Sequence, residues 1–340
     1  MKIVHCIFSL TYGGAETLLI DVLNEQAINN SVTLIVINSE YDSELLKTIC
    51  KKVNIIFIDR KAKSHSILPI IKLNYKLLTI FPDVIHIHNE SIARIILPIF
   101  MNLFLTVHRI GVPSRNFHRL KGIYAISEAV NEDVKQKGEY PVITIPNGIN
   151  LDIIKRRELK KFSNTLRIIQ VARLNHHIKG QDILIKAISI LTKKGYDVTV
   201  DFIGDGESLK VLETLSQELG VSNRVKFLGL RNREYIYNHL CEYDLLCHPA
   251  RSEGFGLVVA EGIAAYLPVL VPDKEGAYEV IGYGKYGSAF TYEDEIDCAD
   301  KIEHIYNNYE EVIKILPVAY KHVKDNYSLS KMVKEYLSNY

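Results

Sequence analysis

Short apolar runs alternate with longer amphipathic stretches along most of the chain. In the first half these runs are KIVHCIF, VTLIVI, NIIFI, DVIHIH, LFLTV, IYAIS and VITI. Runs that are apolar at nearly every position are typical of strands buried on both faces, and the stretches between them are long enough for helical crossovers. The pattern therefore predicts a parallel sheet with helices on both faces.

The alternation breaks once and then restarts. After IPNGIN comes the polar, basic stretch LDIIKRRELKKFSNT, followed by the runs LRIIQVA, VTVDFIG, RVKFLG, DLLCHP and LPVLVP. We predict an α/β fold of two Rossmann-like, doubly wound domains, residues 1–148 and 149–324. The hinge is expected at Asn147-Gly148. Residues 325–340 are amphipathic with no strand after them, and we expect them to pack as a helix on the first domain.

Two apolar segments could belong either to the protein core or to a signal peptide or membrane span. Residues 1–8 are too short and too soon interrupted for a signal peptide, and they predict a buried first strand. Residues 92–107 form the most apolar run of the chain. Arg94, Pro98 and Asn102 break this run below the roughly 20 residues that a membrane span needs. We predict a buried helix followed by a buried strand.

Charge and cysteine content narrow the class of protein. The formal net charge of the 340 residues is +1, which argues against a nucleic-acid binder that relies on excess positive charge. The five cysteines are scattered, with no C-x-x-C pair, so we interpret them as reduced small hydrophobic residues of a cytosolic protein. They are Cys6, Cys50, Cys241, Cys247 and Cys298.

A glycine pair follows the first predicted strand. Gly13 and Gly14 precede the helical pattern AETLLIDVLNEQ, where backbone N–H groups at a helix N-terminus can bind a phosphate. A tight strand-to-helix turn without a ligand is the alternative. The segment is not G-x-G-x-x-G, and no acidic residue ends the second strand, so a nicotinamide-dependent dehydrogenase is disfavoured.

Two cations follow the strand LRIIQVA. Arg173 ends it, and Lys179 precedes the helical pattern GQDILIKAI. Together they could neutralise a diphosphate, although solvated surface cations are the commoner case. His176 and His177 lie between them on what we expect to be an irregular loop, and adjacent side chains there are poorly placed to share a metal.

The segment ARSEGFGLVVAEG carries two glutamates eight residues apart. A strand is expected over residues 244–249, with Glu253 on the loop after it and a turn into the helix LVVAEGIAA. Gly256 and Leu257 would present backbone N–H groups to an anion, and Glu261 lies inside the helix. A carboxylate among apolar residues needs partners such as sugar or ribose hydroxyls; the alternative is a helix-surface residue.

Taken together, these motifs resemble the retaining, nucleotide-sugar-dependent glycosyltransferases of family 4, which have the GT-B fold of two Rossmann-like domains facing across a cleft. The resemblance runs along nearly the whole chain. Its most specific part is the Glu-x7-Glu motif EGFGLVVAE. The order and spacing of further segments support it: VARLNHHIKGQDILIKAI, FIGDGESL, VKFLG, TIPNGIN, YAISEAV and GGAETLL.

The resemblance implies roles for individual residues. Arg173 and Lys179 would bind the donor diphosphate, and Glu261 the ribose hydroxyls. Glu253 would lie beside the donor sugar, with the amides after Gly254, including those of Phe255 and Gly256, near the sugar and phosphate. His108, which follows LFLTV, matches the histidine that contacts the donor sugar; without the family it would be interpreted as a strand-end residue.

The family's D-x-G-G-x-x-E segment departs from its pattern here. It reads DKEGAYE, in which Gly276 and Glu279 keep their places and Glu275 stands where the first glycine belongs. That puts the local backbone and the donor-sugar preference in question, and Glu279 stays among the candidate donor-binding residues. His86 and His88 share one face of the strand DVIHIHN, and we interpret them as structural because no third ligand is evident.

The resemblance implies a retaining enzyme that moves a hexose or N-acetylhexosamine from a nucleotide sugar, UDP being the expected base. The sequence has no strict Asp-x-Asp motif, so we predict metal-independent activity in which cations and helix N-termini stabilise the leaving diphosphate. The expected acceptor is a saccharide or lipid-linked saccharide of bacterial surface polysaccharide synthesis. A non-hydrolysing UDP-sugar 2-epimerase and a non-catalytic GT-B partner subunit are the alternatives.

The first domain is locally basic. This surface could meet an anionic membrane or a lipid-linked pyrophosphate acceptor, which would put a cytoplasmic protein at the inner face of the cell membrane; solvated lysines spread over several faces are the alternative. The residues concerned are Lys51, Lys52, Arg60, Lys61, Lys63, Lys72, Lys76, Arg109, Arg115, Arg119 and Lys121.

Overall fold

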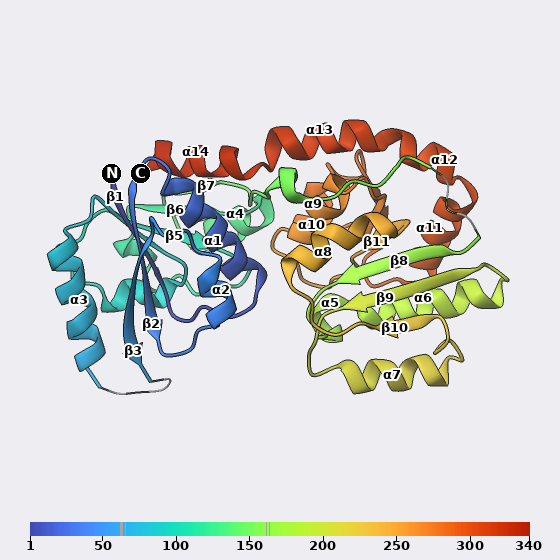
Figure 1. Cartoon of the computed structure of the whole chain (residues 1–340), viewed down its shortest axis with the longest axis horizontal. Coiled ribbons are helices and arrows are strands. Elements are labelled where there is room, and N and C mark those ends of the chain that lie inside the picture. Colours follow the sequence, from blue (N-terminus) through green and yellow to red (C-terminus); the bar gives the residue numbers. More distant parts are fainter. Residues whose placement is uncertain (62–63, 65, 161, 163) are drawn as a thin grey trace. The chain divides into compact units, whose positions relative to one another are not determined.

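A computed structural model describes residues 1–61, 64, 66–160, 162 and 164–340 (Figure 1). Lys63 of the basic set therefore lies outside the described residues. The chain divides into two compact units. Unit 1 comprises Met1–Gly148 and Ser328–Tyr340, and unit 2 comprises Ile149–Tyr327.

Unit 1 is built on a seven-stranded parallel sheet with the order β3-β2-β1-β4-β5-β6-β7. All seven apolar runs of the first half form its strands, so that part of the fold prediction is confirmed. The strands are β1 (Lys2–Ile7), β2 (Ser31–Asn38), β3 (Asn54–Arg60), β4 (Val84–Ile87), β5 (Leu103–Val107), β6 (Gly122–Ala125) and β7 (Val142–Thr144).

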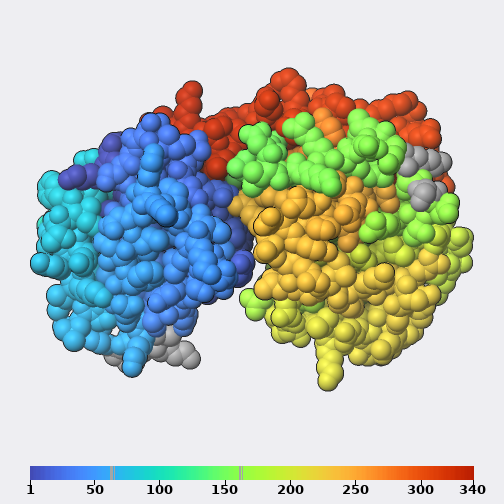
Figure 2. Space-filling view, in the orientation of Figure 1, coloured from blue at the N-terminus to red at the C-terminus, as the bar shows by residue number. Residues whose placement is uncertain are grey.

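The helices of unit 1 join successive strands, and the last segment of the chain adds one more. This final helix packs against the first, and its Tyr336 is buried in the core of the unit. The third helix lies on the surface, where its atoms are cyan in Figure 2. The α-helices are α1 (Gly14–Gln26), α2 (Ser43–Lys47), α3 (Leu68–Ile80), α4 (Glu128–Lys135) and α14 (Leu329–Asn339). Short 3-10 turns are η1 (Glu90–Ile95), η2 (Phe117–Arg119) and, in unit 2, η3 (Leu151–Ile153).

The expected buried helix within residues 92–107 is wrong. Only η1 is helical there; Ile96 is already extended, and the chain then runs irregularly to β5 with exposed apolar side chains. Pro98 accounts for this, because it disfavours the helical conformation of the residue before it and cannot donate a helical hydrogen bond. Side chains of this apolar run are therefore buried in the core mainly near its two ends, in η1 and in β5.

Unit 2 repeats the design with a six-stranded parallel sheet in the order β10-β9-β8-β11-β12-β13. The five apolar runs of the second half are all strands, although β11 is shorter than the predicted 244–249. Ser288–Phe290 adds a sixth strand that the pattern did not predict. The strands are β8 (Leu166–Val171), β9 (Val198–Ile203), β10 (Val225–Phe227), β11 (Leu245–Cys247), β12 (Val269–Pro272) and β13 (Ser288–Phe290).

Helices cover the second sheet, and α6 packs against α11 through buried aliphatic side chains such as Ile188 and Ile302. The helices are α5 (His176–Lys179), α6 (Gln181–Lys193), α7 (Leu209–Glu218), α8 (Arg233–His239), α9 (Leu257–Ala264), α10 (Glu275–Val280), α11 (Glu295–Asn307), α12 (Tyr309–Val312) and α13 (Leu316–Asn326), with 3-10 turns η4 (Leu240–Glu242) and η5 (Ile313–Ile315). No helix in the described residues combines the length and apolarity that crossing a bilayer requires.

Each sheet reverses its strand order at one place, between β1 and β4 in unit 1 and between β8 and β11 in unit 2. Open α/β sheets bind ligands at the carboxyl ends of the strands that flank such a switch point. In unit 2, Arg173 follows β8 and Glu253 follows β11. In unit 1, Gly13 follows β1 and His88 follows β4. The topology thus brings candidate residues to the expected edge of each sheet.

Candidate active site

A buried carboxylate with two basic partners lies at the carboxyl edge of the unit 2 sheet. Lys179 Nζ is 2.8 Å from Glu253 Oε2, and His248 Nε2 is 2.9 Å from the same oxygen. His248 is buried, and within the described residues its Nδ1 has no hydrogen-bond partner. The Nε2–H therefore donates to the carboxylate. We refer to these three residues as the Glu253 cluster.

The Glu253 cluster keeps its carboxylate ionised. Burial by itself would raise the pKa of Glu253, but the hydrogen bond from His248 and the positive charge of Lys179 outweigh burial and hold the pKa well below its usual range. Because the negative charge is already matched by Lys179, the cluster presents little net charge. A ligand bound beside it would meet a fixed, ionised carboxylate and a lysine held at a defined place.

A backbone clamp fixes the loop that carries Glu253. The N–H of Glu253 donates to Glu275 Oε2 at 2.7 Å, and the N–H of Gly276 donates to the carbonyl of Glu253 at 3.1 Å. A Cβ at position 276 would lie 2.3 Å from the carbonyl oxygen of Gly254, so only glycine fits there. The clamp therefore explains why DKEGAYE keeps its second glycine.

Glu275 occupies the place of the family's first glycine and has a left-handed backbone, with φ at +59°. A side chain in the left-handed region costs roughly 1–2 kcal/mol. The hydrogen bond from Glu253 N–H to the Glu275 carboxylate offsets this cost. At the position where this sequence departs from the family pattern, the side chain thus provides an acceptor for the adjacent loop.

Substitutions at Glu275 should separate its strain from its hydrogen bond. Glu275→Ala keeps the left-handed backbone and loses the acceptor, so we expect it to lower the free energy of unfolding by about 1–2 kcal/mol. Glu275→Gly should lose less, because glycine adopts positive φ freely. Glu275→Gln keeps an acceptor oxygen and serves as the matched control. Urea unfolding followed by circular dichroism measures all three, and equal losses for alanine and glycine would contradict the strain argument.

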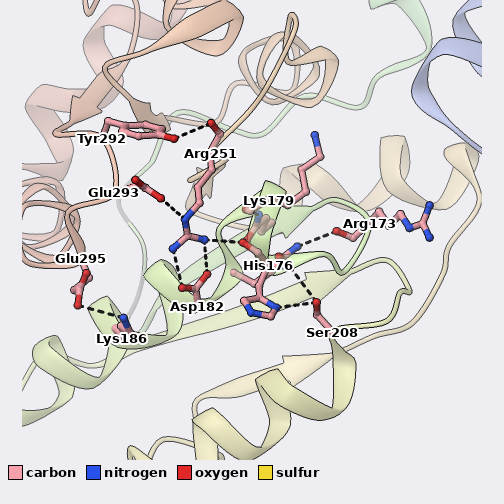
Figure 3. Close-up of polar contacts among 12 residues, drawn as sticks. Arg173, His176, Lys179, Asp182, Lys186, Ser208, Arg251, Tyr292, Glu293 and Glu295 are labelled. Carbon is pink, nitrogen blue, oxygen red and sulfur yellow. Dashed lines mark hydrogen bonds and ion pairs between the residues drawn. The ribbon is translucent and has the colours of Figure 1, made fainter. Parts of the chain in front are cut away.

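Arg251 is a structural member of this site that the sequence interpretation missed (Figure 3). Its guanidinium makes two 2.8 Å hydrogen bonds to the carboxylate of Asp182 on α6, one 2.6 Å bond to Glu293 and one to the carbonyl of His176. These bonds raise the pKa of Arg251, so it stays charged. One arginine therefore ties together α5, α6 and the loop that leads to Glu253. The sequence feature that could have indicated this residue is its position in the segment PARSEG, two residues before Glu253.

Arg173 and Lys179 have different partners. The Arg173 side chain is 75% exposed and pairs with Glu207 at 3.4 Å, whereas Lys179 contacts Glu253. His176 and His177 do not lie on an irregular loop as predicted, because α5 spans both and ends at Lys179. His176 Nδ1 bonds Ser208 Oγ at 2.8 Å, which anchors this helix. The Arg173 side chain is thus open to solvent, whereas that of Lys179 is held against Glu253.

The second glutamate of the motif has a tyrosine partner. Tyr237 Oη donates to Glu261 Oε1 at 2.7 Å, and Arg233 Nε donates to Tyr237 Oη at 2.6 Å. Burial, followed by the nearby charge of Glu261, raises the pKa of Tyr237. Glu261 lies in α9 and is half-buried, so its carboxylate is positioned before any ligand binds.

The turn into α9 has the geometry that the sequence predicted. Gly256 is left-handed, with φ at +92°, and Leu257 is the first helical residue. Phe255 is buried, and its ring packs edge-on against Tyr327, so its side chain belongs to the core. Its backbone N–H donates to Glu253 Oε1 at 3.5 Å. Glu279 is half-buried in the last turn of α10.

The glycine pair of unit 1 is a strand-to-helix turn in which a carboxylate already occupies the helix start. Gly13 caps α1, and a Cβ on it would lie 2.3 Å from Glu16 Oε2. Burial raises the pKa of Glu16, against a hydrogen bond from its own backbone N–H. A phosphate at Gly13 and Gly14 would have to displace this carboxylate.

Four histidines line up behind the carboxyl edge of the unit 1 sheet. His108 Nε2 is 3.3 Å from His88 Nδ1, and His88 Nε2 is 3.0 Å from His5 Nδ1. His5 Nε2 then bonds Gln26 Oε1 at 2.8 Å. Because the amide oxygen can only accept, the chain of bonds assigns the proton of each neutral ring to Nε2. His108 and His88 line a cavity of about 150 Å³ together with Arg109.

The fourth histidine is His86. The sequence interpretation paired it with His88 and found no third possible metal ligand, and His5 supplies that ligand. Ligand nitrogens of His5, His86 and His88 lie within 4.8 Å of one another. The rings stack at interplanar angles of 17–32°, however, and both nitrogens of His86 already bond Tyr340 and Thr106 at 2.7 Å. Stacked rings aim their lone pairs in parallel, so the arrangement fits a hydrogen-bonded imidazole stack better than a tetrahedral metal site.

Comparisons with known proteins agree with this architecture. The structure of Anabaena Alr3699/HepE in complex with UDP-glucose matches all of both chains with a TM-score of 0.83 and 22% identity. The lipopolysaccharide outer core galactosyltransferase WaaB matches with a TM-score of 0.77 and 17% identity over 100% of this chain and 99% of that one. Two parallel-sheet units with these neighbours define a GT-B-like protein.

The family follows from the sequence of the second half. Residues 141–321, more than half of the chain, match the family model of glycosyl transferases group 1, and the chain belongs to this family. An uncharacterized glycosyltransferase of Methanocaldococcus jannaschii is 28% identical over 62% of this chain and 56% of its own length. The putative glycosyltransferase EpsD of Bacillus subtilis is 31% identical over 42% and 37%, respectively. The matched segment thus spans about half or less of these relatives.

Proposed function

We propose that this protein is a retaining glycosyltransferase that moves a hexose or N-acetylhexosamine from a UDP-sugar to a saccharide or lipid-linked saccharide of a bacterial surface polysaccharide. The observation that carries the proposal is the Glu253 cluster at the switch point of unit 2, next to the N-terminus of α9. In this proposal unit 2 binds the donor and unit 1 the acceptor.

The roles follow from charge and position. Lys179 and the exposed Arg173 would neutralise the departing diphosphate, and the N–H groups at the start of α9 would add to this field. Glu261 would accept hydrogen bonds from the ribose, and Glu253 would lie beside the donor sugar. Retention would require the acceptor hydroxyl to approach on the face that the diphosphate leaves.

The names of relatives support the proposed donor and acceptor classes. The matched Anabaena structure contains UDP-glucose, and WaaB is named for the lipopolysaccharide outer core. From these we take a UDP-hexose as the first donor to test and a surface saccharide as the first acceptor class. His108, with its proton on Nε2, would offer its Nδ1 lone pair to a sugar hydroxyl.

Nucleotide binding gives the direct test. In EDTA, one nucleoside diphosphate among UDP, GDP and ADP should raise the melting temperature of the wild type, because ligand at about 100 times its dissociation constant stabilises by about 2.7 kcal/mol. The rise should disappear in Glu261→Ala and persist in Glu213→Ala, a control on the exposed surface of α7. We expect UDP to be that nucleotide.

The outcomes separate the alternatives. A shift with NAD alone would contradict a sugar-nucleotide site, and no shift with any nucleotide would favour a non-catalytic partner subunit. Conversion of the donor sugar in the absence of any acceptor would favour the 2-epimerase. Release of UDP that depends on an added saccharide supports the transferase.

A further inference from the structure

One face of α3 exposes a stripe of large apolar side chains. Leu68, Ile71, Tyr75 and Leu78 recur at helical spacing, and Leu68 and Tyr75 are 70% and 62% exposed. Leu73, on the opposite side, is fully buried in unit 1. The helix therefore has two apolar faces, of which the core covers only one.

A second apolar segment borders this stripe. The side-chain amide of Asn74 donates to the carbonyl of Ile95, and its oxygen accepts from the N–H of Leu97, both at 2.8 Å. Asn74 lies three residues after Ile71 and four before Leu78, so the segment that begins at Leu97 runs beside the stripe. The surface defined here as the α3 face comprises Leu68, Ile71, Tyr75, Leu78 and Phe81 together with Leu97, Ile99 and Met101.

The α3 face combines exposure with positive charge. Met101 and Phe81 are 79% and 75% exposed. Figure 2 shows the atoms of α3 in cyan on the surface of unit 1. Residues 60–82 contain no aspartate or glutamate but several lysines. By helical geometry Lys72 and Lys76 flank the stripe on the side away from Asn74. Lys72 Nζ bonds the carbonyls of Phe57 and Ile58 and pairs with Asp59 at 3.4 Å, so the basic margin consists of the half-buried Lys76 and the exposed Arg94 of η1. An apolar surface with a basic margin is complementary to an anionic lipid surface.

We propose that the α3 face docks on an anionic lipid bilayer, with its apolar side chains entering the headgroup layer and Lys76 and Arg94 meeting lipid phosphates. A second copy of the chain fits less well, because a two-fold interface would bring Lys76 of both copies to one apolar patch. The inference stands apart from the proposed transferase activity. It would place unit 1 at the membrane that holds a lipid-linked acceptor.

Vesicle co-sedimentation tests the docking. Wild-type protein should sediment with phosphatidylcholine vesicles that contain phosphatidylglycerol, more weakly with phosphatidylcholine alone and more weakly at high salt. Ile71→Gln with Leu78→Gln should weaken binding at least tenfold, and Lys76→Gln about fivefold. Since both apolar side chains are exposed, the double variant should melt like the wild type. Val211→Gln with Val318→Gln, two exposed valines of unit 2, is the matched control.

Several results would overturn the proposal. One is failure of the wild type to sediment with the phosphatidylglycerol vesicles, and another is binding that the double variant retains. A third is a concentration-dependent dimer in light scattering that Ile71→Gln with Leu78→Gln dissociates, since this would assign the α3 face to a second copy. UDP binding is measured on the same samples, so that loss of docking and loss of the proposed donor site are distinguished.

Discussion

Lys179→Ala is expected to lower kcat/KM for the donor sugar by about 10²–10³-fold, the loss typical of removing one preorganised group that stabilises developing charge. The physical reason lies in the Glu253 cluster. Lys179 Nζ is held 2.8 Å from Glu253, so its charge is fixed before the diphosphate begins to leave. In the Lys179→Ala variant, His248 is the only side chain of the Glu253 cluster that still donates a hydrogen bond to the carboxylate.

The same variant should also change the titration of the site. Loss of the Lys179 charge raises the pKa of Glu253 toward its usual range, so the low-pH limb of the rate profile should move to higher pH. The measurement is UDP release over a pH series. Lys186→Ala is the control, because Lys186 lies on α6 nearby and pairs with Glu295 at 3.4 Å. Equal losses in the two variants would contradict a specific role for Lys179.

Acid should destabilise unit 1 before unit 2. Burial lowers the pKa of His5 to about 4, and the pKa values of His86 and His88 lie well below 6.5 for the same reason. In the unfolded chain these histidines take up protons as the pH falls through about 6.5, whereas the folded imidazoles stay neutral. Stability is therefore fully present above pH 6.5 and is lost between about 6.5 and 4.

The size of this effect is large because the partners of the stack are neutral. His5 bonds Gln26, and His86 bonds Tyr340 and Thr106, so no carboxylate in these bonds favours an imidazolium. For the fully buried His5 the loss would approach about 3 kcal/mol at the acid end, a large share of ordinary domain stability. His108 is partly exposed at its cavity, and water reduces its share.

Hydrogen exchange can resolve the two units, whose unfolding need not be a single transition. Amides of β1 and β4 should lose protection between pH 6.5 and 5, after correction for intrinsic exchange, while those of β8 and β9 keep theirs. His5→Gln should flatten the pH dependence in β1, and His304→Gln, an exposed histidine of α11, should leave it unchanged. Protection that falls equally in both sheets would contradict the role of the histidine stack.

Sequence pattern determined the sheets, because buried parallel strands need nearly continuous apolar runs whatever surrounds them. All twelve predicted runs are strands, and the Glu-x7-Glu segment has its predicted turn and helix. These features are local: Gly256 adopts a positive φ and Leu257 starts the helix within a few residues of the motif. The family could be inferred from the sequence for the same reason, because the resemblance rests on short local motifs in a fixed order.

Tertiary structure decided which side chains meet. Arg251 reaches Asp182 across 69 positions of sequence, and His5 joins His88 across 83, so no local pattern marks either pair. The carboxylate of Glu275 compensates its own left-handed backbone by accepting from Glu253, a contact that only the folded loops create. The apolar run of residues 92–107 looked like core from its composition, but Pro98 ends the helix and leaves Leu97, Ile99 and Met101 on the surface. The burial of a side chain and its hydrogen-bond partners depend on which segments pack against it. Those segments are brought together only when the whole chain has folded.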